Sequence, residues 1–570
     1  MKRNTLKYSI IIVLFYLASA CSKTDFLERA PSDFIDKEEV FSNLANAEAF
    51  LTNAYRDFPS IYEESPSDNT FFNLGAATDE GVSMLYEAHL GATKFNYNDW
   101  NPSAFPMQSR WSRYYRTIRR LNMFIENSHL IPDEAQDGST AIRMKDRLLG
   151  EAFGLRAFYY FQLFKMWGGV PIIDHVIDPG GEEVLFERAS VDEVVNFIQQ
   201  DLDRAMAILP PRLDEANRGR VTATFCQALL SRVLLYYASP LFNPAQEPSR
   251  WENAYKAAKN AIGFAESNNF ILSRGDAGGL KAYERIFLQL DNSEVISHSA
   301  DLAFGSHFDG WESYAHSLGY GGWHAESPIQ EFVDAYEMDN GKLPVLGYDA
   351  NDKPVVNPES GFDPSDPYSN RDPRFYQTIL YHGARWKGRE VNIKRGGLDF
   401  NEDRPRILYF WRKYCTESYN LVTNSGRVNK KFVLFRLSEL YLNYAEALNE
   451  FMPAPDNQVY DAVNVIRNRS GMPDLPTGLN KDQMRDRIRH EKRIEFALEN
   501  QRFWDVRRWK IAEFTDNGPV RKVEVSANDE FIYPVYHRRI FDPNKSYLFP
   551  IPQLEIDKTD GLLVQNPGWN

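Results

Sequence analysis

The segment RLLGEAFGLRAFYYFQLFKMWGGVP, residues 147–171, predicts a long helix and the point at which it ends. From Arg147 to Trp167 it contains no proline, and alanine, leucine and aromatic residues dominate it. Gly168 and Gly169 supply the backbone freedom that helix ends use, and Pro171 cannot continue a helix because it lacks the backbone N–H. We therefore expect a helix over residues 147–167.

Further helices are predicted on both sides, because apolar residues recur there at helical spacing. Ser190 and Glu193 form a capping box, and the proline pair after Leu209 ends the helix that they start. The predicted helices cover residues 36–55, 111–127, 147–167, 190–209, 222–236, 251–264, 435–450, 458–470 and 481–512. Several form antiparallel pairs with short connections, which resembles tetratricopeptide packing, although no clean repeat of about 34 residues is present.

Two regions between the predicted helices have a different character. Residues 66–110 are polar and aromatic, and residues 270–428 are rich in Gly, Pro, Asp and Asn, with short β-like runs at 295–297 and 407–410. Loops of this length are usually functional or disordered, and their aromatic content argues against disorder. The predicted fold is mostly α with minor β. A helical scaffold covers roughly residues 36–65, 111–265 and 430–570, and two long irregular insertions interrupt it at roughly 66–110 and 270–428.

The first twenty residues resemble a lipoprotein signal peptide. Three basic residues precede the apolar run YSIIIVLFYL, residues 8–17, which is too short to span a bilayer but suits a secretory signal. Three small residues then stand directly before Cys21, as in a bacterial lipobox. We expect cleavage before Cys21, lipidation of its thiol and a tether over residues 21–35. The alternative is a plain signal peptide with an incidental cysteine.

The charge of the chain excludes one class of partner. The formal charge is −14, and removal of the basic signal peptide would make the mature chain more negative. Such a surface repels phosphate backbones, so nucleic acid is not expected as the main partner.

No later stretch is long, apolar and uncharged, so the chain is expected to be anchored without spanning the membrane. Cys226 and Cys415 are expected to be buried thiols.

Segments from one end of the chain to the other follow the pattern of one known family. They are Phe26–Pro31, Ala54-Tyr55, Trp111…Tyr115…Ile118…Asn122, Glu151–Tyr160 with Trp167–Pro171, Gly219–Thr222, Arg436–Ala447, Ile466–Gly471, Glu491–Phe496 with Arg502–Arg508, Leu548–Gln553 and Gln565–Trp569. In this order behind a lipobox, they resemble the SusD/RagB lipoproteins of bacterial outer membranes.

The resemblance implies a fold, a place and a partner. It implies a SusD-like helical scaffold with tetratricopeptide-like pairs and with ligand sites on the intervening loops. It also implies a lipid-anchored protein on the outer membrane of a Gram-negative bacterium, facing the cell exterior. There it would bind an oligosaccharide or polysaccharide and deliver it to a SusC-like TonB-dependent transporter. No cofactor and no metal site are expected, and a structural calcium ion stays open because no loop has EF-hand spacing.

The aromatic loops are the candidate binding site. A pyranose ring presents an apolar C–H face and an equator of hydroxyls, so its site needs a flat exposed aromatic ring with amides or carboxylates around it. Glycine-flexed loops of both insertions carry such residues. The predicted ligand-binding residues are Tyr97, Trp100, Asn101, Trp311, Tyr314, Tyr320, Trp323 and His324, with Trp100 and Trp323 foremost. The alternative is that these rings pin the loops to the scaffold. Trp386, Tyr409 and Trp411 are expected to pack rather than bind.

No catalytic residues are predicted, and the protein is not expected to be an enzyme. Glu151, Glu439 and Glu446 lie inside predicted helices, and nothing places two of them across a sugar-sized gap. His490 and Glu491 begin like a zincin helix, but Ile494 takes the place of the second histidine.

The spacing of the charged residues around His490 predicts instead a structural network of ion pairs along a helix. They are Glu491, Arg493, Glu495, Glu499, Arg502, Asp505 and Arg508.

Three rivals to glycan capture remain open. The chief rival is the same architecture with peptide as cargo, because the RagB side of the family resembles a peptide importer. A cleft of backbone-pairing strands and charged pockets would favour peptide, whereas stacked aromatics favour glycan. The second rival is a lipid-anchored glycoside hydrolase, which turnover of oligosaccharide by the purified protein would reveal. The third is a purely structural scaffold with all loop aromatics packed inward.

Overall fold

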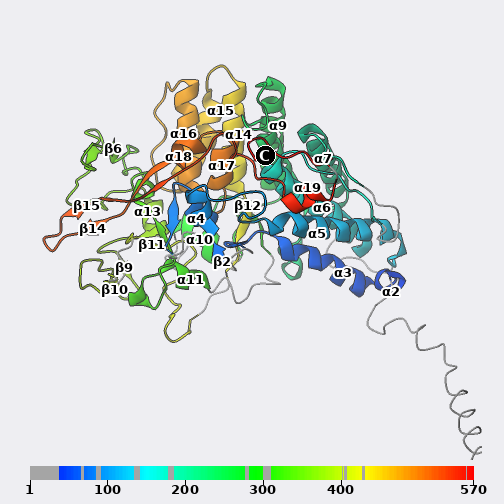
Figure 1. Cartoon of the computed structure of the whole chain (residues 1–570), viewed down its shortest axis with the longest axis horizontal. Helices are drawn as coiled ribbons and strands as arrows, with labels where there is room; N and C mark the ends of the chain where they lie inside the picture. The colour runs from blue at the N-terminus through cyan, green and yellow to red at the C-terminus, as the bar shows by residue number, and fades with distance from the viewer. Residues whose placement is uncertain are drawn as a thin grey trace, which may run out of the picture.

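The computed structural model describes residues 37–65, 70–84, 91–133, 142–177, 185–275, 281–289, 291–299, 310–400, 402, 407–426, 430–559 and 561–569. The predicted signal peptide, Cys21 and the tether lie outside these residues. The described part is mostly helical (Figure 1). None of its helices combines the length and the apolar character that a membrane span requires.

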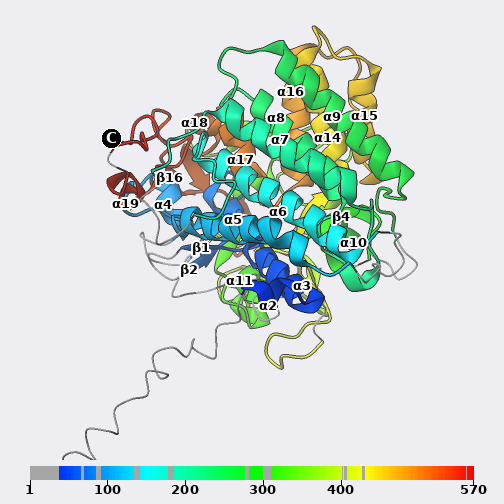
Figure 2. The same cartoon turned by 90° about the vertical axis from the view of Figure 1, so that its right-hand side faces the viewer.

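The N-terminal half is built from helices that pack in chain order. They are α2 (Lys37–Phe41), α3 (Leu44–Thr52), η2 (Asn53–Asp57), α5 (Ser109–Asn127), α6 (Met144–Trp167), α7 (Val191–Ile208), α8 (Ala223–Ala238) and α9 (Pro248–Ser267). α5 packs on α6, α6 on α7, α7 on α8 and α8 on α9, as Figure 2 shows from the side. This succession of neighbouring helices is tetratricopeptide-like packing, as predicted.

Local signals set the ends of these helices. The Ser190 Oγ accepts from the Glu193 N–H at 3.2 Å, and the Glu193 carboxylate accepts from the Ser190 N–H at 2.8 Å, which is the predicted capping box. Gly168 ends α6 with a φ of +76°. The helix predicted over 36–55 is instead three short elements, because Asn43 stops α2 and caps α3.

The second helical group follows the long insertion. It comprises α14 (Leu437–Phe451), α15 (Asn457–Arg469), α16 (Lys481–Glu495), α17 (Arg502–Arg508) and α18 (Ala512–Thr515). α14 packs on α9 and joins the two groups. The single helix predicted over 481–512 is wrong. Leu498 and Asn500 adopt positive φ, and Asn500 donates to the Ser60 carbonyl at 2.9 Å, so the chain turns between α16 and α17.

The β structure consists of short antiparallel pairs. In the described residues these are β1 (Glu63–Ser65) with β2 (Thr70–Phe72), β3 (Gly81–Ser83) with β5 (Glu326–Pro328), β4 (Val295–His298) with β12 (Val433–Arg436), β6 (Val345–Tyr348) with β7 (Pro354–Val356), β8 (Ile379–Leu380) with β11 (Phe410–Trp411), β9 (Arg385–Trp386) with β10 (Arg389–Glu390), β13 (Gly518–Arg521) with β16 (Val535–Arg539) and β14 (Glu524–Val525) with β15 (Phe531–Ile532). Pairs such as β3–β5 and β4–β12 tie the insertions to distant parts of the chain.

Short helices fill the remaining connections. They are η3 (Leu74–Ala77), α4 (Gly91–Asn96), η4 (Ser128–Leu130), η5 (Glu215–Asn217), α10 (Ala282–Leu288), α11 (Gly310–Ala315), η6 (Leu318–Tyr320), α12 (Gln330–Val333), α13 (Pro373–Thr378) and α19 (Gln553–Asp557).

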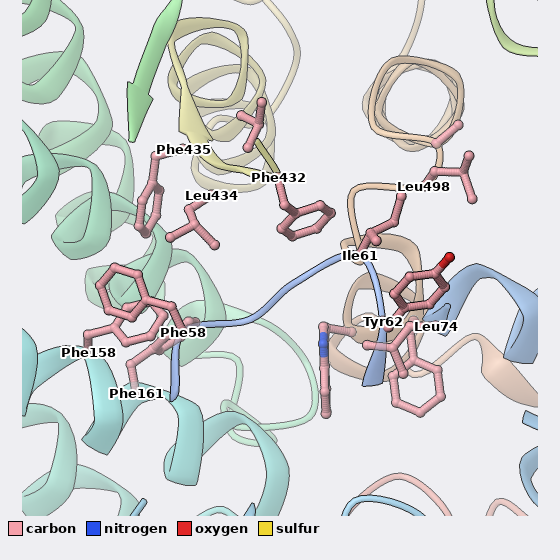
Figure 3. Close-up of a cluster of buried hydrophobic side chains, with 14 of the residues drawn as sticks. Phe58, Ile61, Tyr62, Leu74, Phe158, Phe161, Phe432, Leu434, Phe435 and Leu498 are labelled. Carbon is pink, nitrogen blue, oxygen red and sulfur yellow. The ribbon is translucent and has the colours of Figure 1, made fainter. Parts of the chain in front are cut away.

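The segment 58–62 connects two parts of the hydrophobic core. Phe58 packs 4.8 Å from Phe158 and lies parallel to Phe225 at 6.2 Å, between the helices of the scaffold. Figure 3 shows that the chain then runs to Ile61 and Tyr62, beside Leu74 and Leu498. All of these side chains are buried. The core of the scaffold therefore continues into the region that carries the insertion.

A buried ion-pair network joins the elements of the C-terminal third. The Arg436 guanidinium contacts Glu294 at 2.9 Å, Glu495 at 2.6 Å and Glu499 at 2.8 Å, and all four side chains are almost fully buried. Arg469, Arg436 and Arg374 hold the pKa of Glu495 well below its usual range despite burial.

The predicted network is confirmed, but most of its pairs connect different elements. Arg502 binds Asp79 at 2.8 Å, and Arg508 binds Glu446 at 2.5 Å. Arg508 with Asp505 is a pair at helical spacing.

Candidate functional site

A column of four aromatic rings, two of them from α11, runs from the surface to the core. The outermost ring is Trp323, which is 59% exposed. Its centroid lies 5.5 Å from that of Tyr314, which lies 5.2 Å from Tyr62, which lies 5.8 Å from Trp311. Trp311 is fully buried and donates its indole N–H to the Lys413 carbonyl at 3.0 Å. The column thus backs one exposed indole with rings that cannot move freely.

The backbone around Trp323 folds back on α11. The Trp323 N–H donates to the Ser313 carbonyl at 2.6 Å, and the Ala325 N–H donates to the Tyr314 carbonyl at 2.8 Å. A Cβ at Gly322 would lie 2.3 Å from the His316 carbonyl oxygen, so only glycine fits this close return. The loop then enters β5, whose residue Glu326 pairs with Ser83 of β3. Trp323 therefore sits on a loop, residues 316–325, that is fixed at both ends. This loop is called the hook below.

A buried carboxyl lies beneath the column. Glu326 accepts from the Asn73 N–H at 2.7 Å, and burial raises the pKa of its carboxyl to about 8. Burial, together with the Glu326 charge, also raises the pKa values of the Tyr62 and Tyr314 phenols. Burial therefore favours the protonated forms of Glu326, Tyr62 and Tyr314.

Tyr320 lies at the edge of the hook and is half-buried. The Arg389 guanidinium sits 3.6 Å from its ring centroid, and its hydroxyl donates to the Trp386 carbonyl at 3.1 Å. Asp399 holds Arg389 with two hydrogen bonds of 2.7 and 2.8 Å. One face of Tyr320 is therefore covered by a fixed cation.

A polar loop borders the same surface. Residues 417–426 are largely exposed and include Glu417, Ser418 and Asn420. This loop touches the hook, because a Cβ at Gly321 would meet Val422 at 2.9 Å. Leu318 and Val422 are 55% and 79% exposed. The polar loop thus borders the hook at Gly321.

The structure does not place Trp100, the other foremost predicted residue, at the surface. Trp100 is 5% exposed, because the C-terminal segment covers it: its ring lies 4.4 Å from Trp569 and 5.3 Å from Phe549. The prediction that the face of Trp100 is an exposed platform is therefore wrong. Its neighbour Asn101 uses its side-chain oxygen within a turn, where it accepts from the N–H groups of Ser103 and Ala104 at 3.0 and 3.1 Å.

Two further predicted residues are also buried and cannot offer a ring to a ligand. Trp311 is the inner end of the aromatic column, and His324 is 3% exposed with its ring 4.7 Å from Phe410. Tyr97 is 38% exposed, but it lies against His537 rather than in the aromatic column. The structure thus brings together Trp311, Tyr314 and Trp323, with Tyr320 at the edge. Sequence reasoning missed Tyr62, which comes from the predicted scaffold.

The residues expected to pack do so. Trp386, Tyr409 and Trp411 are each at most 1% exposed. Cys226 and Cys415 are free and buried, as predicted, and burial raises the pKa of both thiols.

The carboxylates weighed as catalytic candidates are occupied by cations. Glu151 binds Arg220 at 2.9 Å, Glu439 binds Arg232 at 2.5 Å, and Glu446 binds Lys492 at 2.9 Å. Each carboxylate is almost fully buried. These ion pairs hold neighbouring parts of the scaffold together.

Two cavities lie away from the column. One, of about 410 Å³, is polar and lies between the 211–222 connection and β4. The other, of about 430 Å³, is mainly apolar and is lined by Trp111, Tyr115, Phe186 and Leu563, among others. Across the described part of the chain, no group of His, Cys, Asp and Glu residues is placed to hold a metal ion.

Comparisons with known proteins agree with this architecture. The sequence model of the SusD family matches residues 284–569, and a model described as "starch-binding associating with outer membrane" matches residues 25–235. SusD-like protein P2 of Formosa agariphila is 25% identical over 99% of this chain and 100% of its own. SusD-like protein P38 of the same bacterium is 23% identical over 94% of this chain and 96% of its own.

Solved structures show the same fold. A SusD-like protein from Bacteroides fragilis superposes with a TM-score of 0.76 at 28% identity, covering 95% of this chain and 100% of its own. A SusD-like carbohydrate-binding protein from the same species gives 0.73 at 23% identity, over 92% and 100%. A laminarin-binding SusD-like protein gives 0.58 at 23% identity, over 92% and 99%. With a family model that matches half of its length and relatives that match it from end to end, the chain belongs to the SusD family.

Proposed function

We propose that the protein captures a glycan at Trp323 and delivers it to a SusC-like TonB-dependent transporter. The observation that carries the proposal is an indole that is 59% exposed on a fixed hook and is backed by Tyr314. Membership of a family with carbohydrate-binding and laminarin-binding relatives supports it. The mechanism is binding without turnover, in which the indole stacks on the C–H face of a sugar ring.

The strength of such a site suits transfer. A shallow aromatic site of millimolar to micromolar affinity corresponds to about 4–8 kcal/mol. A ligand that was held much more tightly would not leave for the channel. Several sugar units along a polymer, together with anchoring beside the transporter, can offset the modest affinity of one site.

We propose that the mature protein is tied to the outer membrane through a lipid on Cys21 and faces the cell exterior. The residues before Cys21 and the outer-membrane description of the matching family model support this placement. Metabolic labelling with a radioactive fatty acid tests it. The label is expected on the wild-type protein, and a Cys21→Ser variant that still carries it would refute the anchor.

A glycan panel tests the binding function. The chain from Ser22 onward is titrated with polysaccharides and oligosaccharides by affinity electrophoresis and calorimetry, alongside Trp323→Ala. The matched control is Phe514→Ala, which removes an aromatic ring that is 75% exposed on α18. We expect one polysaccharide class to bind, with affinity lost in Trp323→Ala and kept in Phe514→Ala.

Each of the other outcomes would favour one alternative function or site. Silence across the panel contradicts glycan capture, and a peptide library then tests the RagB-like alternative. Turnover of a bound oligosaccharide by the purified protein supports the hydrolase. Binding that survives in Trp323→Ala overturns the site and leaves the glycan function standing.

A further inference from the structure

A lysine stands in the tight turn of the hairpin formed by β9 and β10. Trp386 pairs with Arg389, so Lys387 and Gly388 form the two-residue turn between the strands. Their φ angles are +47° and +82°, as in the mirror-image turn that commonly joins two strands with two residues. That turn favours asparagine, aspartate or glycine at its first position, because a residue with a bulky side chain resists a positive φ. The backbone of the turn therefore gives no reason for a lysine at this position.

The side chain of Lys387 connects three parts of the candidate site. Its ammonium donates to the Glu312 carboxylate of α11 at 3.0 Å and to the Tyr419 carbonyl of the polar loop at 2.5 Å. The Glu312 side chain is fully buried, and the Lys387 side chain is 12% exposed. The β9–β10 hairpin, α11 and the polar loop of residues 417–426 thus meet at one ammonium group, at the lower left of Figure 1.

Glu312 does not need Lys387 to balance its charge. Its carboxylate also contacts the Lys430 ammonium, and it accepts from the Thr416 N–H at 3.0 Å. Burial, together with the charges of the two lysines, lowers the pKa of His316 well below its usual range, so this imidazole is neutral. Two lysines therefore share one buried carboxylate. Because burial of an additional charge costs free energy, the second lysine indicates a task other than neutralising Glu312.

The polar loop is the part that Lys387 holds. Most of this loop is closed on itself, because Asn420 and Ser425 exchange backbone hydrogen bonds of 2.8 and 3.3 Å. Those bonds fix the shape of the loop, whereas its position depends on contacts with other parts of the chain. The Tyr419 carbonyl stands directly before the closed segment and accepts from Lys387. This hydrogen bond therefore holds the base of the closed segment in place.

The polar loop meets the hook at two points. A Cβ at Gly321 would lie 2.9 Å from Val422, so the loop packs directly on the hook there. Burial raises the pKa of the Tyr320 phenol to about 12, and the charge of Glu417 contributes to this rise. Both points lie within three positions of Trp323 in the sequence. The position of the polar loop is therefore coupled to the part of the hook that leads into the exposed indole.

We propose that the polar loop is the second wall of the glycan site and that Lys387 is the positioning residue that holds this wall against the hook. This inference rests on the proposed function. The Trp323 indole takes the apolar face of a sugar ring, and the carboxylate, hydroxyl and amide groups of the loop bind its hydroxyls. Lys387 acts on the ligand through the Tyr419 carbonyl. Without its ammonium the loop leaves the hook for part of the time, and apparent affinity falls with the fraction that stays in place.

Lys387→Asn separates the position of the loop from the stability of the fold. Asparagine suits the turn but lacks the ammonium, and Lys430 still balances Glu312, so the thermal unfolding temperature should stay close to that of the wild type. A hydrogen bond from a charged group shifts a local equilibrium by about tenfold or more. We therefore expect about tenfold faster hydrogen exchange in residues 414–426, measured by mass spectrometry. Glycan affinity, measured by calorimetry, should fall by up to about tenfold.

Lys510→Asn is the matched control. Lys510 also has a positive φ, of +56°, and it lies just after α17. It is exposed, and its ammonium lies 5.6 Å from the centroid of the Tyr547 ring. The same substitution in the same backbone conformation therefore leaves the Glu312 cluster intact. This variant should match the wild type in the exchange of residues 414–426 and in glycan affinity.

Trp323→Ala distinguishes failure of this inference from failure of the proposed function. If Trp323→Ala loses glycan binding while Lys387→Asn keeps wild-type affinity or wild-type exchange in the loop, the role of Lys387 is overturned and the proposed function stands. If no glycan binds, or if Trp323→Ala binds as the wild type does, the proposed site fails and the loop is not its wall. Faster exchange throughout the chain in Lys387→Asn, or equal changes in Lys510→Asn, would indicate a general loss of structure and would overturn the positioning role.

Discussion

The rings of Trp323 and Tyr314 lie 5.5 Å apart with their planes inclined by 53°. This pair is the point at which the exposed platform meets the interior, because Tyr314 is half-buried and contacts Tyr62 on its other side. An exposed indole loses rotamer freedom when it stacks on a sugar, and a neighbour that already restricts the ring reduces that loss. We therefore expect Tyr314 to contribute to glycan affinity at the proposed site without touching the ligand.

Removing the supporting ring should weaken binding. In Tyr314→Ala the Trp323 indole loses its packing partner, and an aromatic pair contributes about 0.5–1.5 kcal/mol. We expect up to about a tenfold loss of glycan affinity by calorimetry, with faster rotation of the Trp323 indole by fluorescence anisotropy. Tyr314→Phe keeps the ring and should bind as the wild type does. Equal affinity of the alanine and phenylalanine variants would show that the support is irrelevant.

Trp100→Ala should separate stability from binding. The Trp100 ring is packed against Trp569 and Phe549, so its removal leaves a cavity and should cost about 3–5 kcal/mol of folding free energy. Thermal unfolding should begin at a clearly lower temperature. Below that transition the variant should bind the recognised glycan with wild-type affinity, because no face of Trp100 reaches the ligand. Loss of binding in a variant that is fully folded would return Trp100 to the site.

Arg436→Gln should be among the most destabilising changes in the chain. The change leaves Glu294, Glu495 and Glu499 buried without the positive charge of Arg436. Breaking such a cluster costs about 3–5 kcal/mol of folding free energy. Urea-induced unfolding measures the loss. Arg395→Gln is the control, because Arg395 is 85% exposed and its pair with Glu402 is screened by water. Similar midpoints for the two variants would mean that the buried network contributes little.

Local signals in the sequence predicted much of the helical scaffold. The Ser190 and Glu193 capping box, the glycine pair after Trp167 and the Thr222 cap act through neighbouring residues, and each lies where it was predicted. The break between α16 and α17 was not predictable in this way. There Glu499 turns inward to Lys413 and Arg436, which lie more than sixty positions away in sequence.

The two foremost tryptophans show the same limit for the site. Trp100 and Trp323 both lie in polar, glycine-bearing segments beside Asn, Asp or Tyr residues. Nothing near Trp100 in sequence reveals that Phe549 and Trp569 will cover it, because those residues are more than four hundred positions away. The choice between platform and core is made by tertiary packing.

Glu326 should make folding stability depend on pH. Its carboxyl has a pKa of about 8 in the folded protein because of burial, against 4.5 for an ordinary glutamate. The folded state therefore keeps a proton that the unfolded state releases between these values. Stability attributable to this group should be complete below pH 4.5 and should fall as pH rises toward 8. The total change is at most about 5 kcal/mol.

Comparison of the wild type with Glu326→Gln isolates this contribution from those of the other titrating groups. Glutamine keeps an oxygen that can accept from the Asn73 N–H and carries no proton to lose. The difference in unfolding free energy between the two proteins should grow in favour of the variant as pH rises from 5 toward 8. Because Glu326 lies near the Trp323 column and the folded protein releases its proton only near pH 8, we expect the glycan affinity of the wild type to hold from pH 5 to 7 and to decline as pH rises through 8. A pH-independent difference between the two proteins would mean that the buried carboxyl ionises at an ordinary pKa.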